Sequence, residues 1–88
     1  MKIKKGFVLR RVMGNYVVVA VGEASRSFRG MIKLNGTAAE VWKGIEKGLS
    51  VSEICDAICA EYDVEREVAL SDVEKVICEL TENGFIAE

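Results

Sequence analysis

The chain has 88 residues, half of them hydrophobic, and its 12 basic and 14 acidic side chains give a formal net charge of −2. Domains usually contain about 100–150 residues, so this length predicts a single domain over residues 1–88 with little room for a deep enzymatic cleft. No apolar run approaches the roughly 18 residues of a membrane span, and the N-terminus lacks the apolar stretch of a secretion signal. These features predict a cytoplasmic protein, and an odd number of cysteines, three, indicates reduced thiols.

The charge is divided between two halves of the chain. Residues 1–34 contain eight cations and one acid, a net charge of +7, whereas residues 35–88 contain four cations and thirteen acids, a net charge of −9. A basic half of this kind can meet nucleic acid, an acidic partner, or the acidic half of its own domain. Composition leaves all three open, with attraction between the halves favoured.

The N-terminal half predicts an antiparallel hairpin. Residues 7–12 and 16–21 are rich in β-branched and aromatic side chains, and between them Gly14 and Asn15 tolerate the positive φ of a tight turn. The second run is apolar at odd and even positions alike, which predicts a central strand covered on both faces.

Residues 22–27 predict a looser turn, and residues 29–34 a third strand with Ile32 and Leu34 on one face and Met31 and Lys33 on the other. If the three strands pair in chain order, the middle strand is paired on both sides, and the first and third strands are the edges of the sheet. Arginines and lysines guard the first edge against stray pairing, and the third is less defended. Gly30 there marks a bulge or a close backbone approach, or is an ordinary glycine near a turn.

Two cap signals divide the second half into helices. Asn35 is a good N-cap for a helix that ends near Lys47, where Gly48 can adopt the left-handed conformation. Ser50 and Glu53 form a capping box that starts a second helix, which ends around residues 62–63. The apolar face of the first helix contains Ala38, Val41, Trp42 and Ile45, and that of the second contains Val51, Ile54, Cys55, Ile58 and Tyr62.

A third helix is predicted over roughly residues 65–83, and Asn83 and Gly84 end it. Phe85 and Ile86 then form a short extended tail or wing. The expected apolar stripe of this helix consists of Ala69, Leu70, Val73, Val76, Ile77 and Leu80.

Catalytic chemistry is poorly represented. The sequence lacks histidine, the commonest general base and metal ligand, and has no glycine-rich phosphate loop. Cys55, Cys59 and Cys78 make a poor zinc set unless an acid such as Asp56 joins them. We therefore predict no catalytic site, no metal and no cofactor.

Three helices and a short tail have the layout of a winged helix, a fold that often binds DNA. The presumptive recognition helix, however, carries six acids against two cations from residue 65 onward. A phosphate backbone attracts cations and would repel this surface. A winged-helix transcriptional regulator therefore stays as the alternative function, and nucleic acid is not the expected partner.

Several short motifs follow one another along the chain. They are Leu34-Asn35-Gly36-Thr37-Ala38 with Val41-Trp42, then Glu61-Tyr62-Asp63-Val64, then Asp72-Val73, Val76-Ile77, Leu80 and Asn83-Gly84-Phe85-Ile86. In order and spacing they resemble the PqqD-like proteins, small peptide-recognition modules of pathways for ribosomally made, post-translationally modified peptides. The resemblance implies an α+β fold, a winged helix-turn-helix with a three-stranded antiparallel N-terminal sheet followed by three helices.

The resemblance also implies a function without chemistry. Such a module holds the leader of a precursor peptide for a modifying enzyme, for example a radical S-adenosylmethionine maturase. The leader is bound as an added strand along the third strand, in the groove against the third helix. Mapped onto this chain, the peptide-binding residues are Arg29, Gly30, Met31, Ile32, Lys33, Ala69, Asp72, Val73 and Val76.

Several alternatives stay open. Ile32 and Val73 are equally well explained as core residues. A free sheet edge can also pair with a second copy of the chain, so a homodimer is an alternative occupant of that edge. The sequence names neither the precursor peptide nor the enzyme.

We predict that the purified protein has no catalytic activity of its own and needs no metal, because it lacks histidine and its thiols are scattered. Elemental analysis of protein purified without chelator is the measurement. Near-stoichiometric zinc or iron that survives dialysis would contradict this expectation.

Overall fold

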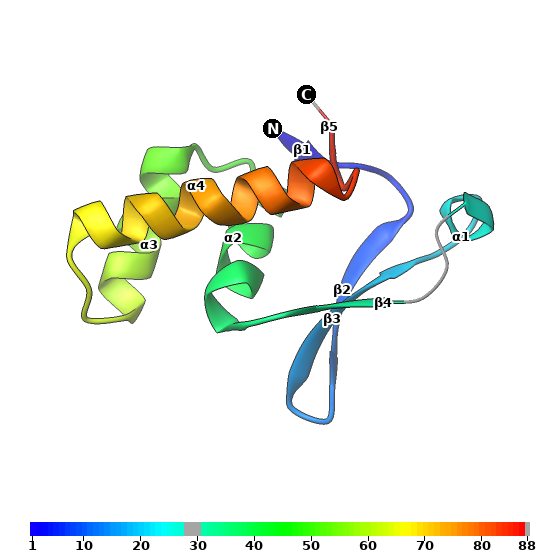
Figure 1. Ribbon diagram of the computed structural model, residues 1–88, viewed down its shortest axis with the longest axis horizontal. Helices are drawn as coiled ribbons and strands as arrows, with labels where there is room; N and C mark the ends of the chain where they lie inside the picture. The colour runs from blue at the N-terminus through cyan, green and yellow to red at the C-terminus, as the bar shows by residue number, and fades with distance from the viewer. Residues whose placement is uncertain (28–30, 88) are drawn as a thin grey trace.

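The computed structural model describes residues 1–27 and 31–87. Strands β2, β3 and β4 form an antiparallel sheet in that order, and β1 and β5 form a separate antiparallel pair (Figure 1). The elements in chain order are β1 (Lys2–Ile3), β2 (Phe7–Val12), β3 (Asn15–Ala20), α1 (Ala24–Ser27), β4 (Met31–Leu34), α2 (Gly36–Glu46), α3 (Val51–Glu61), α4 (Arg66–Glu82) and β5 (Ile86–Ala87). This arrangement confirms the predicted α+β class, the three-stranded sheet and the three main helices. Among the described helices, none is both long and apolar enough to cross a bilayer.

The β2–β3 hairpin turns in two residues. Val12 pairs with Asn15, so Met13 and Gly14 alone form the loop, with φ values of 51° and 82°. Two positive φ values in succession are typical of a type I′ turn, which matches the right-handed twist of the strands. Of the two residues expected to tolerate positive φ, Gly14 adopts it, whereas Asn15 is the first residue of β3 and Met13 occupies the left-handed region instead.

The segment predicted as a looser turn contains one helical turn, α1. Ser25 and Arg26 donate backbone N–H bonds to Gly22 and Glu23, and the Ser25 hydroxyl donates to the Gly22 carbonyl at 2.6 Å. The chain then reaches β4, whose described part begins at Met31. Arg29 and Gly30, predicted to start that strand, lie outside the described residues.

Each helix cap that the sequence predicted is present. The Asn35 side chain accepts a hydrogen bond from the Ala38 amide at 2.8 Å, and α2 begins directly after it. Ser50 and Glu53 make both bonds of the capping box at the start of α3. Gly48 follows the end of α2 with a φ of 79°, as expected for a helix C-terminus.

Aromatic rings join α2, the C-terminal tail and the sheet. Trp42 is fully buried, its ring centroid lies 5.7 Å from that of Phe85, and Phe85 lies 4.9 Å from Phe7, both edge to face. Such pairs contribute about 0.5–1.5 kcal/mol beyond the area they bury. The sequence placed Phe85 only in a tail, whereas the structure buries it completely.

The tail residues after Phe85 pair with the N-terminus, which sequence patterns missed. Ile86 and Ala87 lie opposite Ile3 and Lys2, so the two termini lie side by side (Figure 1). A two-residue strand is too short to show periodicity, so β1 has no local signature.

One side of α4 packs on the core through Ala69, Val73 and Leu80, which are all buried. Leu70, expected on the same stripe, is 38% exposed. Successive helical residues are rotated by about 100°, so Leu70 cannot share the direction of buried Ala69.

The expected attraction between the halves is not made by direct ion pairs in the described parts of the chain. The two ion pairs there join Lys43 to Glu40 and Arg66 to Asp56, all within the acidic half. A cation–π contact joins the halves instead, with the Lys43 ammonium 4.8 Å from the centre of the Tyr16 ring.

We predict that Asn35→Ala lowers the free energy of unfolding by about 0.5–2 kcal/mol, because it leaves the Ala38 amide without its acceptor. Ser25→Ala is the control, since it removes an exposed bond within a single helical turn and should cost much less. Chemical denaturation of both variants is the measurement. Equal midpoints would show that the cap does not stabilise α2.

Candidate functional site: a groove between β4 and α4

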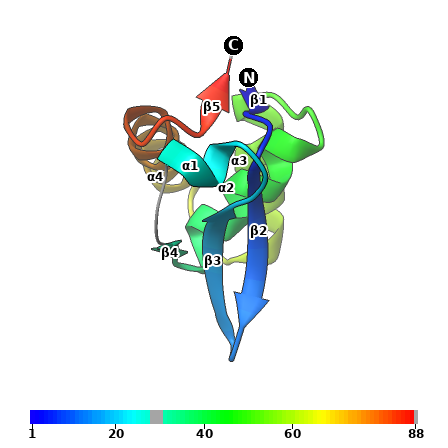
Figure 2. The same ribbon diagram turned by 90° about the vertical axis from the view of Figure 1, so that its right-hand side faces the viewer.

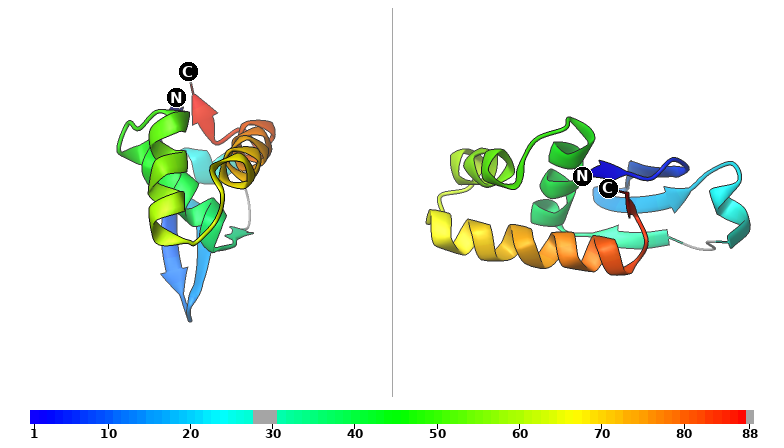
Figure 3. Two further views of the ribbon diagram at one scale, coloured as in Figure 1. Left: turned by 90° about the vertical axis from the view of Figure 1, so that its left-hand side faces the viewer. Right: turned by 90° about the horizontal axis from the view of Figure 1, so that it is seen from above.

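Within the described residues, β4 pairs with β3 on one side and with no strand on the other. Its outer edge faces α4: β4 lies on the α4 side of β3 in Figure 2, and between β3 and α4 in the right-hand view of Figure 3. An unpaired edge displays N–H and C=O groups that can pair with another strand.

Hydrogen bonding in the β2–β3 pair shows which groups of β3 face each neighbour. Phe7 lies opposite Ala20, so Gly6 and Val21 are the next pair along this register, and the Val21 amide donates to the Gly6 carbonyl at 2.7 Å. In an antiparallel pair, bonded and non-bonded residues alternate. The odd-numbered residues of β3 therefore direct their backbone groups to β2, and the even-numbered residues direct theirs to β4.

The same alternation determines what β4 leaves open. Ile32 lies opposite Val18, an even-numbered residue, so Ile32 and Leu34 direct their backbone groups toward β3. Met31 and Lys33 then direct their N–H and C=O groups to the outer edge. Met31 is 67% exposed and Lys33 is also exposed, so water reaches this edge.

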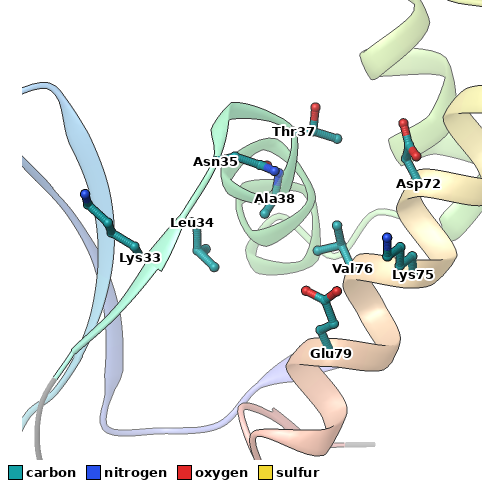
Figure 4. Close-up of a pocket in the computed structure, with 9 residues that line it drawn as sticks. All are labelled: Lys33, Leu34, Asn35, Thr37, Ala38, Asp72, Lys75, Val76 and Glu79. Carbon is teal, nitrogen blue, oxygen red and sulfur yellow. The ribbon is translucent and has the colours of Figure 1, made fainter.

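A groove of about 270 Å³ lies between the end of β4, the start of α2 and α4. In Figure 4, Leu34 on one side and Val76 and Glu79 on the other point toward the space between the two elements. The complete lining is Lys33, Leu34, Asn35, Thr37, Ala38, Asp72, Lys75, Val76 and Glu79.

The groove lining combines the apolar side chains of Leu34, Ala38 and Val76 with balanced charge. Two cations, Lys33 and Lys75, accompany two acids, Asp72 and Glu79. None of the four belongs to an ion pair within the described residues. The groove thus offers apolar contact, charges of both signs and a free strand edge, which together suit an extended peptide.

The predicted site residues fall into four groups. Lys33, Asp72 and Val76 line the groove, and Met31 lies on the open edge beside it. Ile32 is half-buried against the core. Ala69 and Val73 are 1% and 0% exposed, so the structure corrects their assignment to the groove wall: α4 turns them into the core. Arg29 and Gly30 lie outside the described residues.

Sequence reasoning missed Lys75 and Glu79 on α4. With Asp72 and Val76 they follow helical spacing, so they share one face of α4. That periodicity was visible in the sequence: Asp72 and Val76 were predicted to bind the peptide, but Lys75 and Glu79 at the same helical spacing were not. Leu34, Asn35, Thr37 and Ala38 were likewise predicted as the end of a strand and the capped start of a helix, and not as a wall of the groove.

The three thiols lie outside the groove. Burial raises the pKa of the Cys55 thiol, and the carboxylate of Glu82 beside Cys78 raises the pKa of that thiol. Cys59 is half-buried. In the part of the chain that the structure describes, no three histidine, cysteine or acidic side chains are grouped closely enough to hold a metal ion.

Comparison with known proteins gives one family and two related structures. Residues 15–86 match the family model described as coenzyme PQQ synthesis protein D (PqqD). TbiB1 in complex with the TbiA(beta) leader peptide is 25% identical, the match covers all of both chains, and the TM-score is 0.78. Lasso peptide synthetase B1 complexed with the leader peptide is 24% identical over 99% of this chain and 96% of the other, with a TM-score of 0.82. Among curated proteins, none matches this chain.

We predict that Glu82→Gln speeds alkylation of Cys78 at pH 8, because the thiolate is the reactive form. Removing the carboxylate lowers the raised pKa of the thiol, which increases the thiolate fraction below that pKa, and the difference should vanish at higher pH. Iodoacetamide labelling followed by mass spectrometry of the Cys78 peptide is the measurement. Glu79→Gln is the matched control, because Glu79 contributes least to the shift, and equal acceleration by both variants would contradict the assignment.

Proposed function

This chain belongs to the family of coenzyme PQQ synthesis protein D, and on that premise we propose that it is a non-catalytic protein that binds the leader of a ribosomally made precursor peptide. The two related structures each contain a leader peptide. The observation that carries the proposal is the open edge of β4, which faces α4 across a groove of mixed apolar and charged character.

The leader adds to the sheet as a strand beside β4. Met31 and Lys33 each offer one N–H and one C=O at the outer edge, so the described part of the strand can form up to four backbone hydrogen bonds. Because each contributes about 0.5–1.5 kcal/mol net, four contribute roughly 2–6 kcal/mol.

Backbone pairing alone is too weak for the proposed function. Micromolar binding requires about 8 kcal/mol, and ordering a flexible peptide adds a further cost. Apolar side chains of the leader must therefore fill the groove between Leu34 and Val76, whereas Asp72, Lys75 and Glu79 select the polar side chains that accompany them.

The bound leader is presented to a modifying enzyme, which supplies the chemistry. A radical S-adenosylmethionine maturase is one such enzyme. The absence of histidine from the sequence and the position of the thiols outside the groove support a role without catalysis. A short precursor gene beside a maturase gene would agree with this proposal.

The structure does not favour the alternative function, DNA binding. Helix α4 carries five acids against two cations, and the groove beside it is balanced in charge. A phosphate backbone gains little binding free energy on a surface where acids equal or outnumber cations. A second copy of the chain is the remaining competitor for the β4 edge, and it would compete with the leader directly.

We predict that Lys33→Pro weakens binding of the leader by at least about tenfold, because it removes an outward N–H and leaves a leader carbonyl unpaired. Lys33→Ala is the matched control. It removes the same charge but keeps the donor, so it should mainly change the association rate and its salt dependence. Calorimetry with the leader of the precursor encoded beside this gene is the measurement.

Amide chemical-shift mapping of the wild type locates the peptide, and the amide spectra of the two variants without peptide show whether they are folded. Shifts should concentrate at residues 31–34 and 72–79. Shifts that avoid both segments, or equal affinity of Lys33→Pro and Lys33→Ala, would show that the leader does not add to β4.

A further inference from the structure

A second concave surface lies at the opposite end of α2 from the groove. It has a volume of about 620 Å³, and we call it the basic cleft: its charged lining residues are Lys2, Lys4, Lys5, Lys47 and Glu46. The groove contacts the first turn of α2 and the basic cleft contacts its last turn. Because α2 has 11 residues, the two sites are about 16 Å apart along it.

The charge of the basic cleft is not neutralised by the fold. Its four lysines are all exposed, and none of them takes part in an ion pair with a described residue. Glu46 is the one acid in the lining. The groove, by contrast, has equal numbers of acids and cations.

The lysines stand on an ordered scaffold. Lys2 pairs with Ala87 in the β1–β5 ladder, and the Lys4 amide donates to the Phe85 carbonyl at 2.8 Å. At the end of α2, the Lys47 amide donates a hydrogen bond to the Lys43 carbonyl at 3.1 Å. The charged groups are therefore presented from a fixed backbone, which lowers the ordering cost of binding an anionic partner.

The basic cleft also has an apolar floor. Ile3 and Phe7 are partly buried, pack against the core and line the cleft beside the lysines. A partner that only carries negative charge would leave this floor unused. A segment with both carboxylates and an apolar side chain would contact the lysines and the floor together.

We propose that the basic cleft is a docking surface for an acidic segment of a partner protein, with carboxylates at Lys2, Lys4 and Lys5 and an apolar side chain against Ile3 and Phe7. This site is separate from the leader groove and does not depend on the function proposed for it. The separation allows a leader and a docked partner to be held at the same time.

Charge favours a protein segment over nucleic acid. Exposed charges are screened beyond about 8 Å at physiological salt, so a short acidic segment senses mainly the four local lysines. A duplex extends farther and meets the half of the chain that carries a net charge of −9. The polyanion is therefore repelled where the short segment is not.

The test uses two synthetic peptides, one with repeats of Glu-Glu-Leu and one with Gln in place of each Glu. Fluorescence anisotropy should show binding of the acidic peptide and at least about tenfold weaker binding of the neutral one. Amide shifts caused by the acidic peptide should map to residues 2–7 and 45–48. A wild type that does not bind the acidic peptide, or shifts confined to residues 31–34, would overturn the proposal.

A pair of charge-matched variants separates this site from net charge. Lys4→Glu/Lys5→Glu should weaken binding of the acidic peptide at least about tenfold, whereas Arg10→Glu/Arg26→Glu, which alters two exposed arginines elsewhere in the basic half, should change it less than about twofold. If the reversals unfold the protein, the Gln versions of the same pairs replace them. Equal losses in both variants, or tighter binding of a short DNA duplex at the basic cleft in the same buffer, would overturn the proposal.

Discussion

The edge-to-face contact of Trp42 with Phe85 holds the C-terminal tail on the core of this small protein. Phe85 lies three residues after the end of α4, so burying it against Trp42 and Phe7 brings the end of α4 onto the core. The Phe85 carbonyl accepts a hydrogen bond from the Lys4 amide, and β5 pairs with β1. One buried ring therefore positions both α4, which forms a wall of the groove, and the N-terminal strand, which presents the lysines of the basic cleft.

The two edges of the three-stranded sheet are treated differently. On β2, Arg10 and Arg11 lie toward the exposed hairpin tip, and such charges discourage pairing with other chains. On β4, two of the four described residues, Met31 and Lys33, direct their backbone N–H and C=O groups outward. This edge faces the groove, whose lining includes Leu34 and Val76. A short edge limits nonspecific association, and the groove beside it would add the side-chain contacts that the proposed leader peptide needs.

Charge contributes little to contacts within this fold. The ion pairs of the described residues lie within the acidic half, and exposed pairs of this kind contribute about 0–1 kcal/mol. The lysines of the basic cleft pair with none of those acids. Their repulsion is a cost to the folded state, and an acidic partner would relieve it.

Local interactions explain what the sequence by itself determined. The Asn35 cap, the Ser50–Glu53 box and the hairpin each depend on residues a few positions apart, so they could be predicted without knowing the fold. The tertiary structure decided the rest. Whether Ala69 or Lys75 faces the groove depends on the rotation of α4, and the pairing of β1 with β5 joins opposite ends of the chain. These features follow from packing around Trp42 and Phe85, and no short stretch of sequence contains that information.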